Sequence, residues 1–298
     1  MTIDLSREAI LVKATFHSWT GDKRIDSATA TEFNDRVNAQ DTAVRHTKKL
    51  LSKSENAMNC RTVISNARKF LNENTVPWTY DGVKLIPKKN FQHVQDSMAE
   101  FEAKIYNAAS LLFESFSQDT RDDREVLGQL FDEAAYIMPH QVFEKFKIDL
   151  QYEPIADLNA PQFDAMGLSV EKIMDQARER QKQAVSRASD DLRARVTDIL
   201  NRTIDRMETL ADKSKKPTAL LKSIEELADV LPRLNIAGDP DIDMAAQQMK
   251  QRILFFSAQD LKDDEESRAE VIQIAREISG TIGRKIKMPV KQPEVAEV

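Results

Sequence analysis

The stretch that decides the fold is SVEKIMDQARERQKQAVSRASDDLRARVTDILNRTIDRMETLADKSKK, residues 169–216. It contains no proline or glycine, and its apolar residues recur at steps of three and four, so we predict one long amphipathic helix. At 1.5 Å per residue this helix is about 70 Å long, which exceeds a typical domain width. The apolar steps keep no strict heptad, which favours packing against the same chain over a sustained two-stranded coiled coil.

The opposite face of this helix carries arginines interleaved with acids. A basic helix face can line a phosphate backbone, and the candidate nucleic-acid contacts are Arg187, Arg193, Arg195, Arg202 and Arg206. Acids one turn before bases, as in Asp191 to Arg195, are typical of a solvated helix with intrahelical ion pairs. No aromatic residue is interleaved to stack on bases. We therefore favour a solvated face and keep nucleic-acid binding as the alternative.

The composition favours helices and gives no general attraction to anionic partners. Charged residues make up 31% of the 298 residues and there are only 7 glycines, which is typical of helices with large solvated faces. The net charge of −6 provides no overall positive field for nucleic acid or acidic lipid. The single cysteine, Cys60, excludes an intramolecular disulfide and fits a buried small apolar position in a reducing compartment. Without a signal-peptide core or an apolar run of about 20 residues, we expect a soluble, cytoplasmic protein with no membrane partner.

Two segments alternate apolar and polar residues with the period of a half-buried strand, Ile10–His17 and Phe146–Tyr152. Because an isolated strand cannot satisfy its own backbone groups, we expect these two strands to pair with each other. The Asp81-Gly82 pair predicts a hairpin with a two-residue turn, in which Tyr80 lies opposite Val83 and Trp78 opposite Leu85.

Helical spacing of apolar residues predicts further helices in the first half. One runs from Thr29 to Leu51 and packs as a hairpin against a second, Met58–Leu71. A third covers Asn90–Phe116 as a core helix. The charged stretch Gln118–Glu125 is interpreted as a solvated connector or a helix start rather than as a metal site.

Three shorter helices are expected to fold back along the long one. Their apolar positions lie within residues 220–231, 244–254 and 269–278. The sequence thus predicts a mainly α protein with a small antiparallel β-sheet (α+β), elongated around its long helix. We expect three regions: an α+β domain over residues 1–160, a helical domain over 161–283, and a flexible tail over 284–298.

No sequence motif assigns a reaction. The chain has no phosphate-cradling glycine loop, no Cys/His metal box, no Gly-x-Ser-x-Gly elbow and no His-Glu-x-x-His. We therefore name no catalytic, cofactor-binding or metal-binding residue and expect no cofactor. An enzyme whose site assembles from distant residues is the third hypothesis, after a scaffold and a nucleic-acid accessory protein.

Several stretches of the first half carry a resemblance. They are Val12-Lys13-Ala14-Thr15-Phe16-His17-Ser18-Trp19-Thr20-Gly21, Thr75-Val76-Pro77-Trp78, Leu85-Ile86-Pro87 and Phe143-Glu144-Lys145-Phe146. Together, from about Glu8 to Ile155, they resemble an uncharacterised family of tailed-phage and prophage proteins, known as a domain of unknown function. Genes of that family are often seen near those of MoxR-type AAA ATPases and VWA-domain proteins.

The resemblance and the long helix lead to one expectation about function. The resemblance implies a phage accessory protein that works in an assembly with such an ATPase, and it implies no site residues. A helix too long for its own domain favours a non-enzymatic scaffold that binds a protein partner or a second copy of itself. The alternative is a DNA replication or recombination accessory protein that binds nucleic acid through the five arginines.

Overall fold

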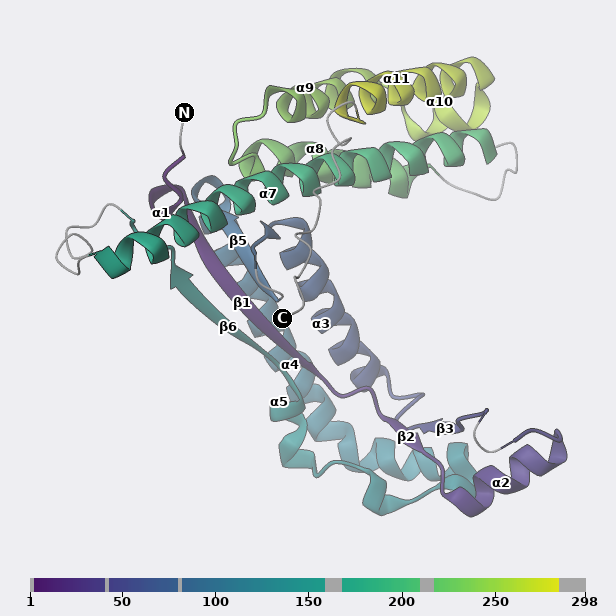
Figure 1. Cartoon of the computed structure of the whole chain (residues 1–298). Helices are drawn as coiled ribbons and strands as arrows, with labels where there is room; N and C mark the ends of the chain where they lie inside the picture. The colour runs from purple at the N-terminus through teal and green to yellow at the C-terminus, as the bar shows by residue number, and fades with distance from the viewer. Residues whose placement is uncertain (1–2, 41–42, 80–81, 159–167, 210–216, 284–298) are drawn as a thin grey trace. The chain divides into compact units, whose positions relative to one another are not determined.

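The structure is a computed structural model that describes residues 3–40, 43–79, 82–158, 168–209 and 217–283. Helices make up most of it, with a small antiparallel sheet and a long helix in the C-terminal half (Figure 1). The predicted α+β class and the predicted long helix are confirmed. The tail predicted over residues 284–298, and the expected end of the long helix at 210–216, lie outside the described residues.

The elements alternate between helix and strand up to residue 154 and are helical thereafter. The helices of the first half are α1 (Leu5–Glu8), α2 (Ser27–Arg36), α3 (Glu55–Glu73), α4 (Lys88–Leu127) and α5 (Val142–Lys145), with short 3₁₀ turns at Gly128–Leu130, Glu133–Ala135 and Pro139–Gln141. The strands are β1 (Ala9–Ser18), β2 (Asp22–Arg24), β3 (Thr47–Lys49), β4 (Val76–Pro77), β5 (Val83–Pro87) and β6 (Phe146–Pro154). The helices of the second half are α7 (Leu168–Thr209), α8 (Thr218–Leu234), α9 (Pro240–Gln248), the π-helical turn Met249–Ile253, α10 (Ala258–Asp263) and α11 (Glu265–Gly283).

Four strands form one sheet in the order β4, β5, β1, β6. β1 runs antiparallel to β5, with Ile10 opposite Ile86 and Val12 opposite Lys84. The two strands predicted from alternation are both present as β1 and β6, and they are neighbours in the sheet. The expectation that they pair is therefore confirmed.

The predicted hairpin at Asp81-Gly82 is present, but its register differs from the prediction. Val76 lies opposite Leu85 and Pro77 opposite Lys84, whereas we expected Trp78 opposite Leu85. A shift of two residues leaves every side chain on the same face, because side chains alternate with a period of two. The loop is wider than a two-residue turn, since the Trp78 N–H donates to the Val83 carbonyl over 3.3 Å. The predicted partner of Val83, Tyr80, lies outside the described residues.

The chain divides into two compact units that interleave along the sequence. Unit 1 comprises the described residues of 1–13, 72–92 and 152–298, and unit 2 comprises those of 14–71 and 93–151. β1, α4 and β6 each continue from one unit into the other. This partition differs from the sequence-based division at residue 160, because tertiary contacts rather than chain order decide which segments pack together.

In unit 2, the helix that we predicted from Thr29 to Leu51 is wrong beyond Arg36, where α2 ends. The residues that follow leave the helical conformation, and Asn38 adopts a left-handed φ of 56°. The chain then forms β3, which pairs antiparallel with β2. The expected packing of this helix against α3 is therefore also wrong. The apolar spacing was misleading because Val37 is 70% exposed and belongs to no core.

Also in unit 2, α4 continues through Gln118–Glu125, the stretch that we interpreted as a solvated connector or a helix start. Two acids of that stretch accept hydrogen bonds from the loop before α3. Asp119 accepts a 2.5 Å hydrogen bond from the Ser54 hydroxyl, and Asp123 accepts a 2.8 Å bond from the Leu51 N–H. These acids are therefore helical residues that bind a neighbouring loop rather than parts of a solvated break.

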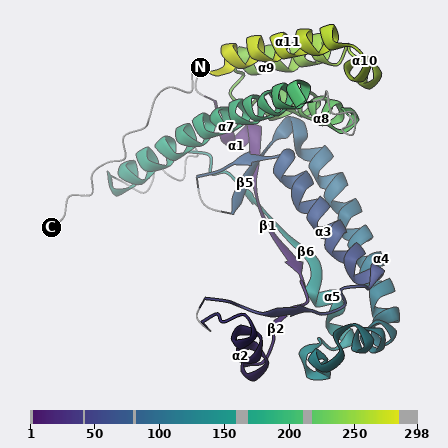
Figure 2. The ribbon, with the colours of Figure 1, turned by 90° about the vertical axis from the view of Figure 1, so that its right-hand side faces the viewer.

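In unit 1, the three predicted C-terminal helices are present as α8, α9 and α11, with α10 as an additional short helix. Figures 1 and 2 show α8, α9 and α11 gathered along the C-terminal part of α7. The expectation that they fold back along the long helix is confirmed. Their shared core contains Leu192, Val196, Leu200, Ile224, Leu231, Ile242, Met249, Val271, Ile274 and Ile278.

Candidate functional site

The long helix α7 changes environment along its length. Its first buried side chain among the described ones is Ala184, and from there Ala188, Leu192 and Val196 continue a buried stripe. This stripe packs into the core of unit 1 together with α11. The C-terminal part of α7 is therefore a structural core helix.

The preceding turns of α7 lie outside that core. Between Lys172 and Gln183 no described side chain is buried, and Ile173 is 64% exposed. Met174 and Ala177 are half-buried, so the apolar stripe continues beyond the buried core positions, with Ile173 as its exposed member. In both views this end of α7 extends past α9 and α11 (Figures 1 and 2).

A polar stripe of α7 covers the edge strand β4. Arg195 donates to the carbonyl oxygens of Glu73 and Thr75 over 2.9 and 2.7 Å, and Arg187 reaches that of Thr79 at 3.4 Å. The two arginines are eight residues apart and lie on one side of the helix. The three carbonyl groups lie just before and just after β4 in the chain, so the guanidinium groups satisfy main-chain acceptors that flank the edge strand.

Two further charged groups lie beside these arginines, Asp191 on α7 and Lys84 on β5. Asp191 forms an ion pair with Arg195 at 2.8 Å, although the same carboxylate oxygen is not aligned for a hydrogen bond. Burial lowers the pKa of Lys84 on β5, and the positive charge of Arg195 lowers it further, while Asp191 opposes the shift. A half-buried ammonium group thus lies next to a guanidinium group.

Arg193 turns into the core rather than toward solvent. Its side chain is only 3% exposed and forms ion pairs with Asp239 and Asp241. Its Nη1 also donates a 3.1 Å hydrogen bond to the carbonyl oxygen of Ile282. Asp239 accepts from the Asp241 N–H as the N-cap of α9, so Arg193 ties α7 to the start of α9 and the end of α11.

The five arginines that the sequence proposed as nucleic-acid contacts therefore do not form one face. Arg193 is buried, and Arg195 binds main-chain carbonyls. Arg202 is exposed and pairs with Asp198 at 3.1 Å, as the i to i+4 spacing predicted. Arg187 is exposed and Arg206 is half-buried. Nucleic-acid contact stays a prediction, and only Arg187 and Arg202 present exposed guanidinium groups.

Sequence reasoning missed the acids that hold Arg193. Gly238-Asp239-Pro240 carried a local signal, because an acid before a proline is typical of a helix start. That signal predicts the cap but not its pairing with Arg193, which lies 46 residues earlier in the chain. The spacing of residues along one helix does not predict which acidic side chains of another helix will contact it.

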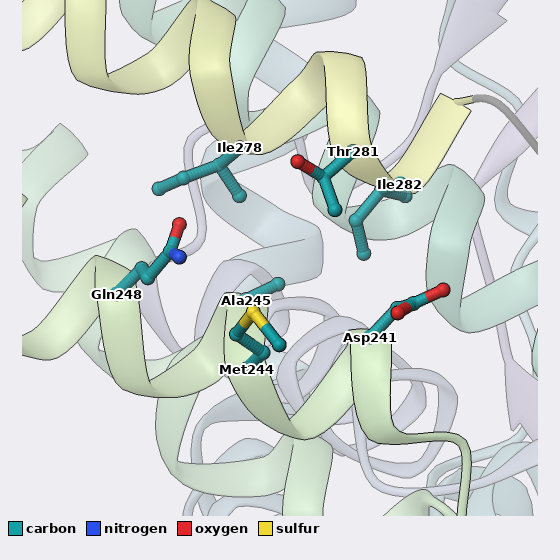
Figure 3. A pocket seen from close by; sticks show the side chains of 7 residues that line it. All are labelled: Asp241, Met244, Ala245, Gln248, Ile278, Thr281 and Ile282. Atoms are coloured by element: carbon teal, nitrogen blue, oxygen red, sulfur yellow. The ribbon is translucent and has the colours of Figure 1, made fainter.

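A shallow depression lies between α9 and α11 (Figure 3). It is lined by Asp241, Met244, Ala245, Gln248, Ile278, Thr281 and Ile282. Among these lining residues Ile278 and Ile282 are buried, whereas Met244 is 46% exposed. The one carboxylate in the lining, Asp241, is already paired with Arg193. The depression therefore brings together no acid–base pair that could carry out a reaction.

In unit 2, Asp123 and Cys60 also have structural roles. Asp123 is 2% exposed and accepts a 2.5 Å hydrogen bond from the Tyr136 hydroxyl in addition to the Leu51 N–H. Cys60 is fully buried, which raises the pKa of its thiol to about 11 and leaves it protonated at neutral pH. The predicted role of Cys60 as a buried apolar residue is confirmed.

No protein-family model, curated protein or solved structure matches this chain. Within the described ranges, no group of histidine, cysteine or acidic side chains is arranged to hold a metal ion. None of the described helices is both long and apolar enough to cross a membrane.

Proposed function

We propose that this protein is a non-enzymatic interaction module, a phage-type accessory protein that acts as a helical scaffold. The observation that carries the proposal is the N-terminal part of α7, where the exposed Ile173 and the half-buried Met174 and Ala177 continue the apolar stripe beyond the core. An isolated helix is marginally stable in water, so helical turns without a core gain stability when a partner covers them. The partner is a protein, and the resemblance in the first half suggests an AAA ATPase or a VWA-domain protein.

The proposal is tested by measuring complex formation with a purified MoxR-type AAA ATPase and a purified VWA-domain protein. Size-exclusion chromatography with light scattering should show a complex, or a dimer of the protein alone. The variant Ile173→Asp should abolish that assembly, because it places a charge on the apolar stripe. Phe255→Asp is the matched control, since Phe255 is 81% exposed but lies outside α7. A wild-type protein that stays monomeric with every partner would contradict the proposal.

The nucleic-acid alternative has a narrower basis in the exposed arginines Arg187 and Arg202. It requires that DNA binding be strong at about 50 mM salt and fall steeply as salt rises, because counterion release drives such binding. The double variant Arg187→Glu with Arg202→Glu should then weaken binding in fluorescence anisotropy. If the scaffold proposal holds, neither single- nor double-stranded DNA binds at that salt concentration.

A further inference from the structure

Unit 2 exposes aromatic side chains that a packed core would bury. Tyr106 is 64% exposed and Phe113 is 43% exposed, although both lie on the core helix α4. Residues seven apart on an α-helix lie on nearly the same side, two turns and about 10 Å from each other. By contrast, Phe116 on the same helix is 3% exposed. The two exposed rings therefore belong to a separate surface of α4.

A third ring lies between them. The centroid of Phe143, on α5, lies 5.6 Å from that of Tyr106 and 5.8 Å from that of Phe113, with the rings tilted by 35° and 41°. The three residues form a continuous set of rings, which we call the aromatic row. Phe143 is half-buried, so it also fixes the row to the rest of unit 2. The row is thus one continuous surface and not three separate side chains.

Acidic side chains accompany the aromatic row. Glu102 lies one turn before Tyr106 on the same side of α4, Glu114 follows Phe113, and Glu144 follows Phe143. All three are exposed, and none has a hydrogen-bond or ion-pair partner among the residues that the structure describes.

Two lysines lie in the same segments and have different roles. Lys104 is on the other side of α4, where it pairs with Glu100 and lies over Phe101. Lys145 follows Glu144 and is the one cation next in sequence to the acids that accompany the row. The three carboxylates therefore outnumber the one cation that is next to them in sequence.

We propose that the aromatic row is a docking surface for a cationic segment of a partner protein, rich in arginine or lysine. Ring faces attract guanidinium and ammonium groups, with guanidinium the more frequent partner. The three carboxylates supply the complementary charge and steer the segment toward the rings. The same carboxylates repel phosphate groups and therefore oppose the binding of nucleic acid or anionic lipid to this surface. This inference goes beyond the scaffold proposal, because it concerns unit 2 and not α7.

The test is a binding titration of the full-length protein with a fluorescein-labelled peptide of alternating arginine and leucine. A peptide with citrulline in place of arginine keeps the shape and loses the charge. We expect the arginine peptide to bind more tightly, and its affinity to fall as salt screens the carboxylates. Equal affinity for the two peptides would overturn the proposal.

Variants locate the binding on the surface. Tyr106→Ala and Phe113→Ala should each weaken the arginine peptide about two- to fivefold. The triple variant Glu102→Gln, Glu114→Gln and Glu144→Gln should remove most of the salt dependence while leaving the rings in place. Leu111→Ala, on another side of α4 and 52% exposed, and Glu125→Gln are the matched controls and should bind as the wild type does.

Two further measurements distinguish binding of a cationic segment from misfolding of the variants and from self-association of the chain. Circular dichroism of each variant checks folding, and the glutamine variant changes only exposed groups, so the test does not depend on the alanine variants. Light scattering without peptide shows whether the row joins two copies of the chain. A dimer that Phe113→Ala dissociates would assign the row to self-association and overturn the cationic partner.

Discussion

Arg193 on α7 donates a hydrogen bond of 3.1 Å from Nη1 to the carbonyl oxygen of Ile282 on α11. The same guanidinium group pairs with Asp239 and Asp241 at the start of α9. One buried side chain therefore joins three helices of unit 1 at a single point.

Replacing Arg193 with alanine should lower the free energy of unfolding by about 3–5 kcal/mol, because it leaves two acids without their buried partner. Urea denaturation of the wild type and the variant measures this change. Arg202→Ala removes an exposed pair from the same helix and should cost less than about 1 kcal/mol. Equal losses for the two variants would show that Arg193 is not a structural anchor.

Gly21 has a φ of +76°, and a Cβ atom there would lie 2.6 Å from the carbonyl oxygen of Leu50. Gly21→Ala should therefore destabilise the protein by about 1–3 kcal/mol through strain and steric conflict. Gly280, in α11, has open space around its Cβ position and no positive φ. Gly280→Ala should instead raise stability by up to about 1 kcal/mol. Thermal denaturation of both variants checks the opposite signs.

Asp123 and Tyr136 should be energetically coupled, since they share a 2.5 Å hydrogen bond in a buried setting. We expect Tyr136→Phe to cost about 1 kcal/mol and Asp123→Ala about 1–3 kcal/mol, because the latter also leaves the Leu51 N–H unsatisfied. A double-mutant cycle in urea measures the coupling, and additive losses would contradict it.

Tyr136 should also affect stability at alkaline pH. Burial, together with the hydrogen bond to Asp123, raises the pKa of Tyr136 above its ordinary value of 10.0. The raised pKa contributes stability that is fully present below pH 10 and is lost as pH rises toward the folded-state pKa. Stability curves against pH should show this loss for the wild type and not for Tyr136→Phe.

Asp149 on β6 should contribute to stability in the opposite pH direction. A hydrogen bond from Lys147 lowers the pKa of Asp149 below its ordinary value of 3.8, and His17 on β1 lowers it further from 2.8 Å. The contribution is therefore present above pH 3.8 and is lost as pH falls through the lower folded-state pKa. The stability difference between the wild type and Asp149→Asn should vanish in acid.

The local patterns of the sequence predicted those elements whose signal is local. Alternation located β1 and β6, and three- and four-residue spacing located α3, α4, α7 and the helices after it. The same spacing failed after Arg36, because Val37 matched a helical position without any core to face. The pairing of β2 with β3 was missed since strands of three residues are too short to show alternation.

The candidate site was less predictable than the fold, for a physical reason. A charge pattern on one helix gives the side on which an arginine lies but not what lies opposite. Arg193 and Arg195 were proposed as nucleic-acid contacts, yet their partners come from segments 46 and 120 residues away. The aromatic row was missed for the same reason, because Phe143 is far in sequence from the two rings that it joins.

The interleaving of the two units has a consequence for synthesis of the chain on the ribosome. Every segment of unit 2 has been made once residue 151 emerges, so this unit can fold while the rest is being translated. Unit 1 cannot complete its folding until α11 has been synthesised, because Arg193 binds Ile282, which is nearly the last described residue. During that interval the edge strand β4 lacks the helix α7, which covers it in the folded protein. Translation order therefore makes unit 1 the late-folding part and the one that depends on protection from aggregation.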